Sequence, residues 1–440
     1  MKKNGFIMST YVYILLVFFL LLLGTMLVVL NNTRLLANKI KDNKNVNVDF
    51  NLILKGDKEI ILKKDSEYIE PGYIATTFDG KKLDVNVMGE VNVNKLGEYD
   101  IIYIAEYKGV EKKIRRKVIV AENLVTYITN LYNNEETRIS NGLKKDNTPD
   151  QNIRYYGSNP NNYVSFNNEL WRIIGVFGNN VKLVRKDSLG ELSWDASESS
   201  VNNGDGVNQW GESTYEDGTS YPGSDLMQYL NKMYYGGDTT IMCYDGSNNT
   251  TTCPKDSKGN FLTIDKTSKS LIDKHTWNTG AIEDNTITDT LAFYSAERGT
   301  TNGKICTGTT FQNGNYCNDT VTRKTTWTGY VALPYVTDWA YASSESVCET
   351  NMQTKNSSNI YICKNNNWMN ERRGWTWYLS PVANPGSACF VWQVFTVGDV
   401  LVGNAAASYF AFPTIYLKSN ILIESGKGTS SNPYILKAGS

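Results

Sequence analysis

The sequence contains few of the residues from which catalytic and metal-binding sites are usually built. Its 440 residues include one histidine, His275, and no CxxC pair, so neither a zinc site nor a histidine-based catalytic triad has support. GxSxG, HExxH and P-loop motifs are also absent. The 44 basic and 45 acidic residues nearly cancel, which excludes the basic patch of a nucleic-acid-binding protein. We therefore expect no enzyme activity, no metal, no cofactor and no nucleic-acid partner.

Cysteine is missing from the first 242 residues, and the seven cysteines follow in a spaced pattern. Six of them form close pairs, each around a polar stretch rich in Gly, Asn or Thr. Such spacing favours three local disulfides in an oxidising compartment. The predicted bridges are Cys243–Cys253, Cys306–Cys317 and Cys348–Cys363. Cys389 is left without a local partner.

Residues 11–30 form a run of apolar residues without a charge. As a helix this run would span roughly 30 Å, the thickness of a bilayer core. Lys2 and Lys3 precede it, and no A-x-A cleavage site follows. We expect residues 1–46 to be an uncleaved membrane anchor and linker, with a cytoplasmic N-terminus and extracellular domains beyond it in a single-pass topology.

The first residues, "KKNGFIMST", also resemble the start of type IV prepilins, in which a short basic leader ends in Gly before a Phe. Gly5 and Phe6 match this pattern, whereas Thr10 stands where that family usually carries Glu. The resemblance implies a processed, pilin-like stalk as the alternative to a plain anchor. Both interpretations place the rest of the chain outside the membrane.

Residues 47–122 change to short runs that alternate apolar and polar residues between Gly, Asp and Asn turns, as in "VNVDFNLIL" and "GEYDIIYIAEY". This pattern predicts an all-β sandwich. The pieces "YIEPGYIATTFDGKKL" and "VNVNKLGEYDIIYIAEYKG" resemble an immunoglobulin-like repeat of bacterial surface proteins. The resemblance implies a spacer without an active site.

Residues 124–440 predict a large α+β domain. Helical periodicity occurs at 124–132 and at 225–235, where Leu226, Tyr229, Leu230 and Met233 share one face. Long polar loops separate runs that read as strands. These runs are "LWRIIGVF", "NVKLVRK", "TLAFYSAE", "GYVALPY", "TWYLSP" and "TIYLKSNILI".

The segments "YVSFNNELWRIIGVFGNNVKLVRKDSLG", "SDLMQYLN", "DTLAFYSAE", "GWTWYLSP" and "PTIYLKSNILIESGKGTSSNPYIL" together resemble a bacterial surface domain with a C-type-lectin-like fold. Formylglycine-generating enzymes share this fold, as do the variable proteins of diversity-generating retroelements. The latter resemblance implies a diversified ligand-binding segment near the C-terminus, in which mutated template adenines turn Asn codons into codons ending in C or T.

Residues 382–412 fit such a segment. Codons ending in C or T cannot encode Lys, Glu, Gln, Met or Trp, and of these only Trp392 and Gln393 occur there. Cys389 can arise from an Asn codon by two adenine changes. The resemblance implies a variable face made by Val382, Ala383, Asn384, Phe390, Phe395, Val397, Asp399, Leu401, Tyr409, Phe410 and Phe412. It implies a fixed scaffold made by Trp377, Leu379, Ser380, Pro381, Trp392, Gly398 and Pro413.

The stretch "AAASYFAFP" has neither strand nor helix periodicity. Tyr409, Phe410 and Phe412 cannot all point inward from one strand, so at least one aromatic ring is expected at the surface. The favoured hypothesis is a bacterial surface receptor or adhesin that binds a protein or glycan on another cell, a phage or a host. The alternatives are a surface enzyme with the formylglycine-generating fold, or a pilin-like structural protein with a buried end strand.

Overall fold

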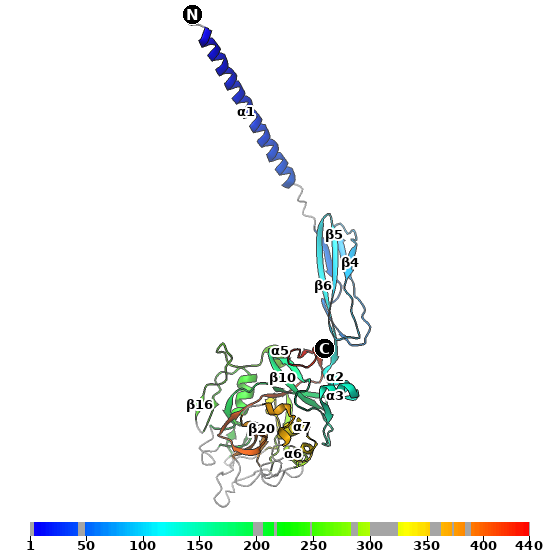
Figure 1. The fold of residues 1–440 in the computed structure, drawn as a ribbon, viewed down its shortest axis with the longest axis vertical. Coiled ribbons are helices and arrows are strands. Elements are labelled where there is room, and N and C mark those ends of the chain that lie inside the picture. Colours follow the sequence, from blue (N-terminus) through cyan, green and yellow to red (C-terminus); the bar gives the residue numbers. More distant parts are fainter. Residues whose placement is uncertain are drawn as a thin grey trace, which may run out of the picture. The chain divides into compact units, whose positions relative to one another are not determined.

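The protein is described from a computed structural model (Figure 1). The structure describes residues 4–42, 49–196, 206–214, 218–246, 249–282, 289–299, 324–352, 362–371, 374–382 and 389–439. The chain divides into two compact units. The first contains the N-terminal helix and most residues up to Val118, and the second contains Ile119 onward together with residues 61–66 and 93–98.

Helix α1 (Asn4–Asp42) is 39 residues long and includes the predicted apolar run. Its stretch from Val12 to Leu35 is long and apolar enough to cross a membrane. These 24 residues would span roughly 36 Å, somewhat more than a bilayer core. The side chains from Val12 to Leu35 are exposed, as a helix surrounded by lipid requires.

Six strands form the immunoglobulin-like β-sandwich, as predicted. They are β1 (Phe50–Leu54), β2 (Glu59–Lys63), β3 (Tyr73–Thr77), β4 (Val85–Met88), β5 (Gly97–Tyr107) and β6 (Val110–Asn123). Strands β1 and β3 pair in one sheet, while β5 lies between β4 and β6 in the other, where β2 also pairs with β6. Phe50 and Leu52 of β1 pack with Ala75 of β3 and Ala105 of β5, so the core lies between the two sheets.

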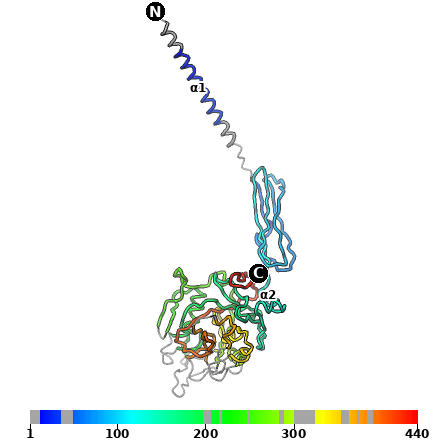
Figure 2. The backbone as a smooth tube through the Cα atoms, in the orientation of Figure 1, coloured from blue at the N-terminus to red at the C-terminus, as the bar shows by residue number. Residues whose placement is uncertain are grey.

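Strands from both ends of the C-terminal unit form its first sheet (Figure 2). The early strands are β7 (Leu143–Lys145), β8 (Ile153–Tyr155), β9 (Tyr163–Phe166), β10 (Glu169–Phe177) and β11 (Asn180–Arg185). The late strands are β19 (Val331–Ala332), β24 (Thr414–Tyr416), β25 (Ile421–Ser425) and β26 (Tyr434–Ala438). β24 pairs with β11, β26 runs parallel to β9, and β25 pairs with Glu122 and Asn123 at the end of β6.

A second sheet has five strands in the order β12-β23-β20-β21-β22. Their bounds are β12 (Glu191–Ser193), β20 (Thr376–Pro381), β21 (Phe390–Val394), β22 (Val400–Asn404) and β23 (Ser408–Phe410). Residues 191–193, 376–381 and 390–410 thus come together in a layer that includes most of the described part of the predicted variable segment. Trp377 and Leu379 of β20 are buried and belong to the same core as Trp171 and Leu183 of the first sheet.

Short helices and hairpins complete the C-terminal unit. The α-helices are α2 (Leu124–Asn133), α3 (Glu135–Asn141), α4 (Asp225–Gln228), α5 (Lys266–Leu271), α6 (Thr290–Glu297) and α7 (Val336–Tyr341). A π-helix, η2 (Tyr229–Tyr235), continues α4, and the 3₁₀-helices are η3 (Ser346–Glu349), η4 (Ile362–Lys364) and η5 (Trp368–Glu371). The hairpins pair β13 (Ser213–Thr214) with β14 (Ser220–Tyr221), β15 (Cys243–Tyr244) with β16 (Thr250–Thr251), and β17 (His275–Asn278) with β18 (Thr326–Gly329).

The two predicted helices are confirmed, although 225–235 is α-helical only in its first four residues. One predicted strand is wrong, because "TLAFYSAE" forms helix α6. Asp289 caps this helix by accepting a hydrogen bond from the Ala292 N–H. Thr290, Phe293, Tyr294 and Glu297 are buried with the i, i+3, i+4, i+7 spacing of one helix face.

Candidate ligand-binding face

A cluster of partly exposed aromatic rings lies on the second sheet. Trp375, directly before β20, stacks on Phe395 with ring centroids 4.4 Å apart. The ring centroid of Tyr409 of β23 lies 6.1 Å from that of Trp375 and 4.5 Å from that of Trp377. Trp375, Phe395 and Tyr409 are each partly exposed, whereas Trp377 is fully buried beneath them. The three outer rings therefore present apolar area to solvent.

Buried indoles support this cluster from below. The distance between ring centroids is 6.0 Å for Trp377 and Trp194 and 4.9 Å for Trp194 and Trp210. It is 6.0 Å for Trp210 and Trp327. The Trp377 Nε1–H also donates a hydrogen bond to the Leu192 carbonyl at 2.8 Å, which fixes the orientation of its ring. A close-packed interior of this kind has little freedom to rearrange. The outer rings are thus held on a rigid base.

Two glycines provide the space that the rings of Tyr409 and Phe410 of β23 occupy. A Cβ at Gly403 of β22 would lie 2.6 Å from Cε2 of Tyr409, and a Cβ at Gly374 would lie 2.5 Å from Cε2 of Phe410. Gly374 also has a φ of +77°, a conformation that side chains disfavour. The placement of Tyr409 and Phe410 therefore depends on the absence of side chains at these two positions.

The predicted variable residues occupy different depths. Phe390, Phe395, Asp399, Leu401, Tyr409 and Phe410 are partly exposed, and Val397 is 37% exposed. Val397 lies in the turn between β21 and β22, where the Phe395 N–H donates to the Asp399 carbonyl. Val382 and Phe412, at 1% and 4% exposure, are core residues and cannot contact a ligand, so the face excludes them. Ala383 and Asn384 lie outside the described residues.

All seven residues predicted as scaffold are buried: Trp377, Leu379, Ser380, Pro381, Trp392, Gly398 and Pro413. Trp392 packs against Phe293 of α6, and its Nε1–H donates to the Ile282 carbonyl at 3.3 Å. Gly398 has a φ of +92°, which explains a glycine in this turn. That these seven residues stay unchanged while the variable positions diversify remains a prediction.

Trp375 is the one member of the aromatic cluster that the sequence-based prediction missed. It stands two residues before Trp377 in "GWTW". Trp375 lies just before β20 whereas Trp377 is buried within it, so the alternation of a strand did not indicate that Trp375 would be partly exposed. The prediction began the variable face only at Val382.

Two of the predicted disulfides are confirmed. Cys243 and Cys253 are joined across the β15–β16 hairpin, and Cys348 of η3 is joined to Cys363 of η4. The predicted Cys306–Cys317 bridge lies outside the described residues. Cys389 is disulfide-bonded and therefore not a free thiol.

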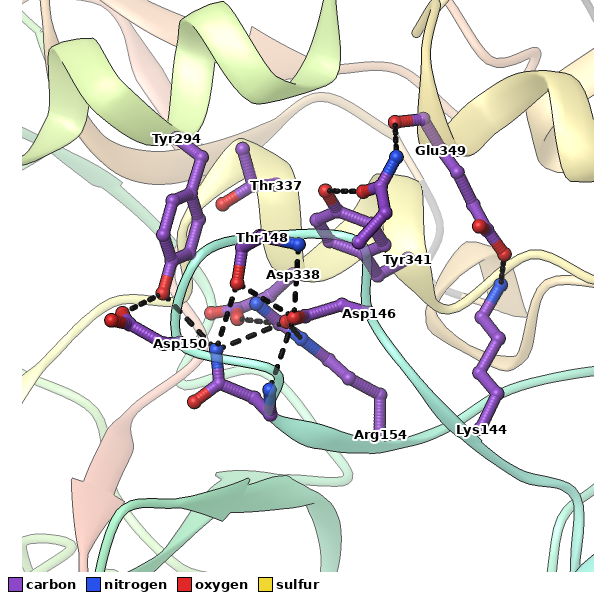
Figure 3. Close-up of polar contacts among 12 residues, drawn as sticks. Lys144, Asp146, Thr148, Asp150, Arg154, Tyr294, Thr337, Asp338, Tyr341 and Glu349 are labelled. Carbon is purple, nitrogen blue, oxygen red and sulfur yellow. Dashed lines mark hydrogen bonds and ion pairs between the residues drawn. The ribbon is translucent and has the colours of Figure 1, made fainter.

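A second cluster, the buried charge network, consists of Asp146, Arg154, Lys182 and Asp338 (Figure 3 draws all but Lys182). The Arg154 guanidinium joins Asp146 and Asp338, with both N–O distances 2.7 Å. All four side chains are at most 1% exposed. The adjacent cation Arg154 offsets the effect of burial and lowers the pKa of the Asp146 carboxyl. Unlike the aromatic cluster, this network is closed to solvent.

His275, the one histidine of the sequence, belongs to neither cluster. The ring of His275 stacks on that of Tyr416, with ring centroids 3.7 Å apart. The Asp273 carboxylate is the hydrogen-bonding partner of His275 Nδ1. Burial lowers the pKa of His275 and so favours the neutral ring. No three His, Cys, Asp or Glu side chains among the described residues are grouped so as to hold a metal ion.

Comparisons with known proteins agree with the immunoglobulin-like assignment of the first domain after the helix. Residues 52–120 match the family model described as "Bacterial surface protein, Ig-like domain". No curated protein matches the chain. A solved structure, the crystal structure of a lipoprotein from Bacteroides thetaiotaomicron, is 22% identical, with 32% of this chain and 62% of that chain covered and a TM-score of 0.17. The immunoglobulin-like module and the apolar helix α1 together indicate a cell-surface protein.

Proposed function

We propose that the protein is a membrane-anchored surface receptor or adhesin whose C-terminal unit binds a ligand through the aromatic face. The face comprises Trp375, Phe395, Tyr409 and Phe410, with Val397, Asp399 and Leu401 beside them. Helix α1 would anchor the chain, and the immunoglobulin-like unit would act as a spacer that keeps the face extracellular. The observation that carries the proposal is a cluster of partly exposed rings on a rigid, buried base.

Physical arguments favour recognition at this face. Aromatic side chains lose little conformational entropy on binding and bury much apolar area, which makes them common anchors of interfaces. Stacking on one another and on Trp377 already restricts their rotamers. A pre-organised face of this kind loses less entropy when a partner binds.

The C-type-lectin-like fold and diversification of residues 382–412 form part of the proposal. The support is the sequence resemblance and the difference in burial between the scaffold residues and the variable residues. The proposed scaffold is buried throughout, whereas seven of the described variable positions are partly or fully exposed. Surface positions on a packed sheet can change identity without large losses of stability, which is what a diversified face requires.

We also propose that the unit binds and does not catalyse. The cysteines described by the structure, namely Cys243, Cys253, Cys348, Cys363 and Cys389, are all disulfide-bonded. They offer no thiolate nucleophile of the sort that an enzyme with a cysteine site needs.

A binding assay tests the proposal. The full chain, incorporated in fluorescent phospholipid vesicles, is added to panels of bacterial cells, host epithelial cells and phage particles, and bound fluorescence is measured. We expect one class of target to retain the vesicles. The bound fluorescence should be at least tenfold lower for the double variant F395S/Y409S.

The matched control is Ile69→Ser, which removes an equally apolar side chain that is 74% exposed in the immunoglobulin-like unit. This variant should bind like the unaltered protein. Equal loss in both variants, or unchanged binding by F395S/Y409S, would contradict the assignment of the face.

A further inference from the structure

The buried charge network contains a lysine and a carboxylate in direct contact. Lys182 Nζ lies 2.5 Å from Asp338 Oδ2, and the two side chains are 0% and 1% exposed. Burying an ion pair is costly because the attraction of the charges seldom exceeds their lost hydration. A contact of this kind deep in the core therefore requires an explanation beyond stability.

Three neighbouring strands and one helix create the contact. Lys182 of β11 is paired with Gly175 of β10, and Gly175 is paired with Arg154 of β8, so Lys182 and Arg154 lie in one row across the sheet. Asp338 belongs to the first turn of α7. Its Oδ1 contacts Arg154 and its Oδ2 contacts Lys182. Gly175 admits no side chain, since a Cβ there would lie 2.2 Å from the Ile153 carbonyl oxygen.

The surroundings of Lys182 favour the neutral amine. Nζ lies 4.1 Å from the ring centroid of Tyr335, and the rings of Phe177, Tyr416 and Trp277 lie between 5.4 and 5.6 Å away. Burial among these rings lowers the pKa of Lys182 to about 8. Because a pKa near 8 leaves about a tenth of the amine unprotonated at neutral pH, a nucleophilic form is available without any external base.

The other contacts of Asp338 suit its carboxyl carbon to attack. The Arg154 Nη1–H donates to Oδ1 at 2.7 Å, and it would stabilise the negative charge that develops on that oxygen in a tetrahedral intermediate. The Tyr335 N–H donates to Oδ2 at 2.9 Å, the oxygen that faces Lys182 and would leave. The ionised carboxylate is the ground state, so reaction proceeds from the minor form in which one proton has moved from Nζ to Oδ2.

We propose that Lys182 and Asp338 form an intramolecular isopeptide bond. The Nζ–Cγ bond forms and the Cγ–Oδ2 bond breaks, with Oδ2 leaving as water. An ammonium and a carboxylate give one amide and one water molecule, so atoms and charge balance without an oxidant, a reductant or an activated co-reactant. The fold supplies the driving force, because intramolecular groups held in contact reach effective concentrations on the order of 10⁵ M or more.

The product fits the buried charge network better than the ion pair does. The reaction removes one positive and one negative charge, and it leaves Arg154 paired with Asp146 at 2.7 Å. No buried charge remains uncompensated, and a neutral amide is less costly to bury than two ions. The bond would join strand β11 to helix α7 across 156 positions of the chain. This inference does not depend on the proposed ligand binding.

Mass spectrometry of the full chain, purified in detergent with its disulfides reduced and alkylated, tests the bond. We expect a mass lower than that of the sequence by one water molecule. Trypsin should not cleave after Lys182, and it should release residues 173–185 joined to the peptide 325–355 that contains Asp338. Lys144 and Glu349 are an internal control, since they are also in contact at 3.0 Å but partly exposed, and trypsin should cleave after Lys144 normally.

The variant Lys182→Arg separates the bond from the ion pair. Arginine keeps the positive charge but has no nucleophilic amine, so this variant should show the full mass of its sequence. An unaltered protein with the full sequence mass and normal cleavage after Lys182 would overturn the proposal. Loss of water that persists in Lys182→Arg would also overturn it, because the dehydration would then lie elsewhere.

Discussion

Individual side chains decide whether the second sheet has a surface for recognition. Phe410 and Trp377 are both aromatic and lie on adjacent strands, yet Phe410 is partly exposed and Trp377 is fully buried. The sequence-based prediction placed Trp377 in the scaffold and Phe410 on the variable face, without knowledge of the strand register. The difference between them provides a test at the scale of single residues.

Replacement of Phe410 by Ser is expected to lower the free energy of unfolding by only about 1 kcal/mol, since part of the ring is already in water. Replacement of Trp377 by Ala removes a side chain that contacts Trp194 and Tyr409, and it should cost about 3–5 kcal/mol. Urea unfolding monitored by circular dichroism measures both values. Similar costs for the two variants would mean that Phe410 belongs to the core.

Secondary structure was predictable where the sequence repeats a period over several residues. The alternation in "GEYDIIYIAEY" became β5, and the face of Leu226, Tyr229, Leu230 and Met233 is buried as expected. Prediction failed for "TLAFYSAE", because a segment of eight residues is consistent with both the two-residue period of a strand and the 3.6-residue period of a helix. Its helical state depends on the Asp289 cap and on packing against Trp392, a contact made across about a hundred residues.

Helix α6 brings Glu297 beneath the first turn of helix α7. The Thr337 N–H and Oγ1–H both donate to this carboxyl group. Burial raises the pKa of Glu297 to about 7, with the Asp338 charge acting in the same direction and Arg298 opposing it. The folded protein therefore binds a proton more tightly than the unfolded chain does.

The contribution of Glu297 to stability is accordingly expected to be greatest below the ordinary pKa of glutamate and to fall as pH rises from about 4.5 to about 7. The variant Glu297→Gln cannot ionise, so it should lose this dependence and gain up to about 3 kcal/mol above pH 7. Thermal unfolding across the pH range measures the effect. The control Glu191→Gln, at an exposed position of β12, should follow the unaltered protein; a curve for Glu297→Gln that still falls across this range would contradict the assignment.

At the scale of the whole molecule, the fold class was predicted in part. Composition and apolar patterning indicated an anchor, a β-sandwich and a larger α+β domain, and the immunoglobulin-like module is confirmed. The sequence could not reveal the buried charge network, because Lys182 and Asp338 are far apart in the chain and neither stands in a recognisable motif. Long-range pairing, which joins residues from both ends of the C-terminal unit, created this contact.

The proposed diversification of residues 382–412 is tested in the coding DNA. Because all Phe, Tyr and Asp codons end in C or T, only Val397 and Leu401 test the codon ending, and both should use codons ending in C or T. A near-copy with AAC or AAT at the codons of Phe390, Phe395, Val397, Asp399, Leu401, Tyr409 and Phe410 should lie close to a reverse-transcriptase gene. Codons for the buried Val382 and Phe412 are expected to vary less between isolates. Genome sequencing of several isolates decides the question, and absence of the near-copy would exclude diversification without excluding adhesion.

The pairing of β25 with the end of β6 has a practical consequence. Ile421 of β25 lies opposite Ala438, and the neighbouring Leu422 lies opposite Asn123, so the last residues of the C-terminal unit return to the point at which the chain enters it. Units with adjacent ends tolerate insertion into a loop of another protein. An insert made of the residues from 119 onward would therefore enter and leave an unrelated carrier at neighbouring points.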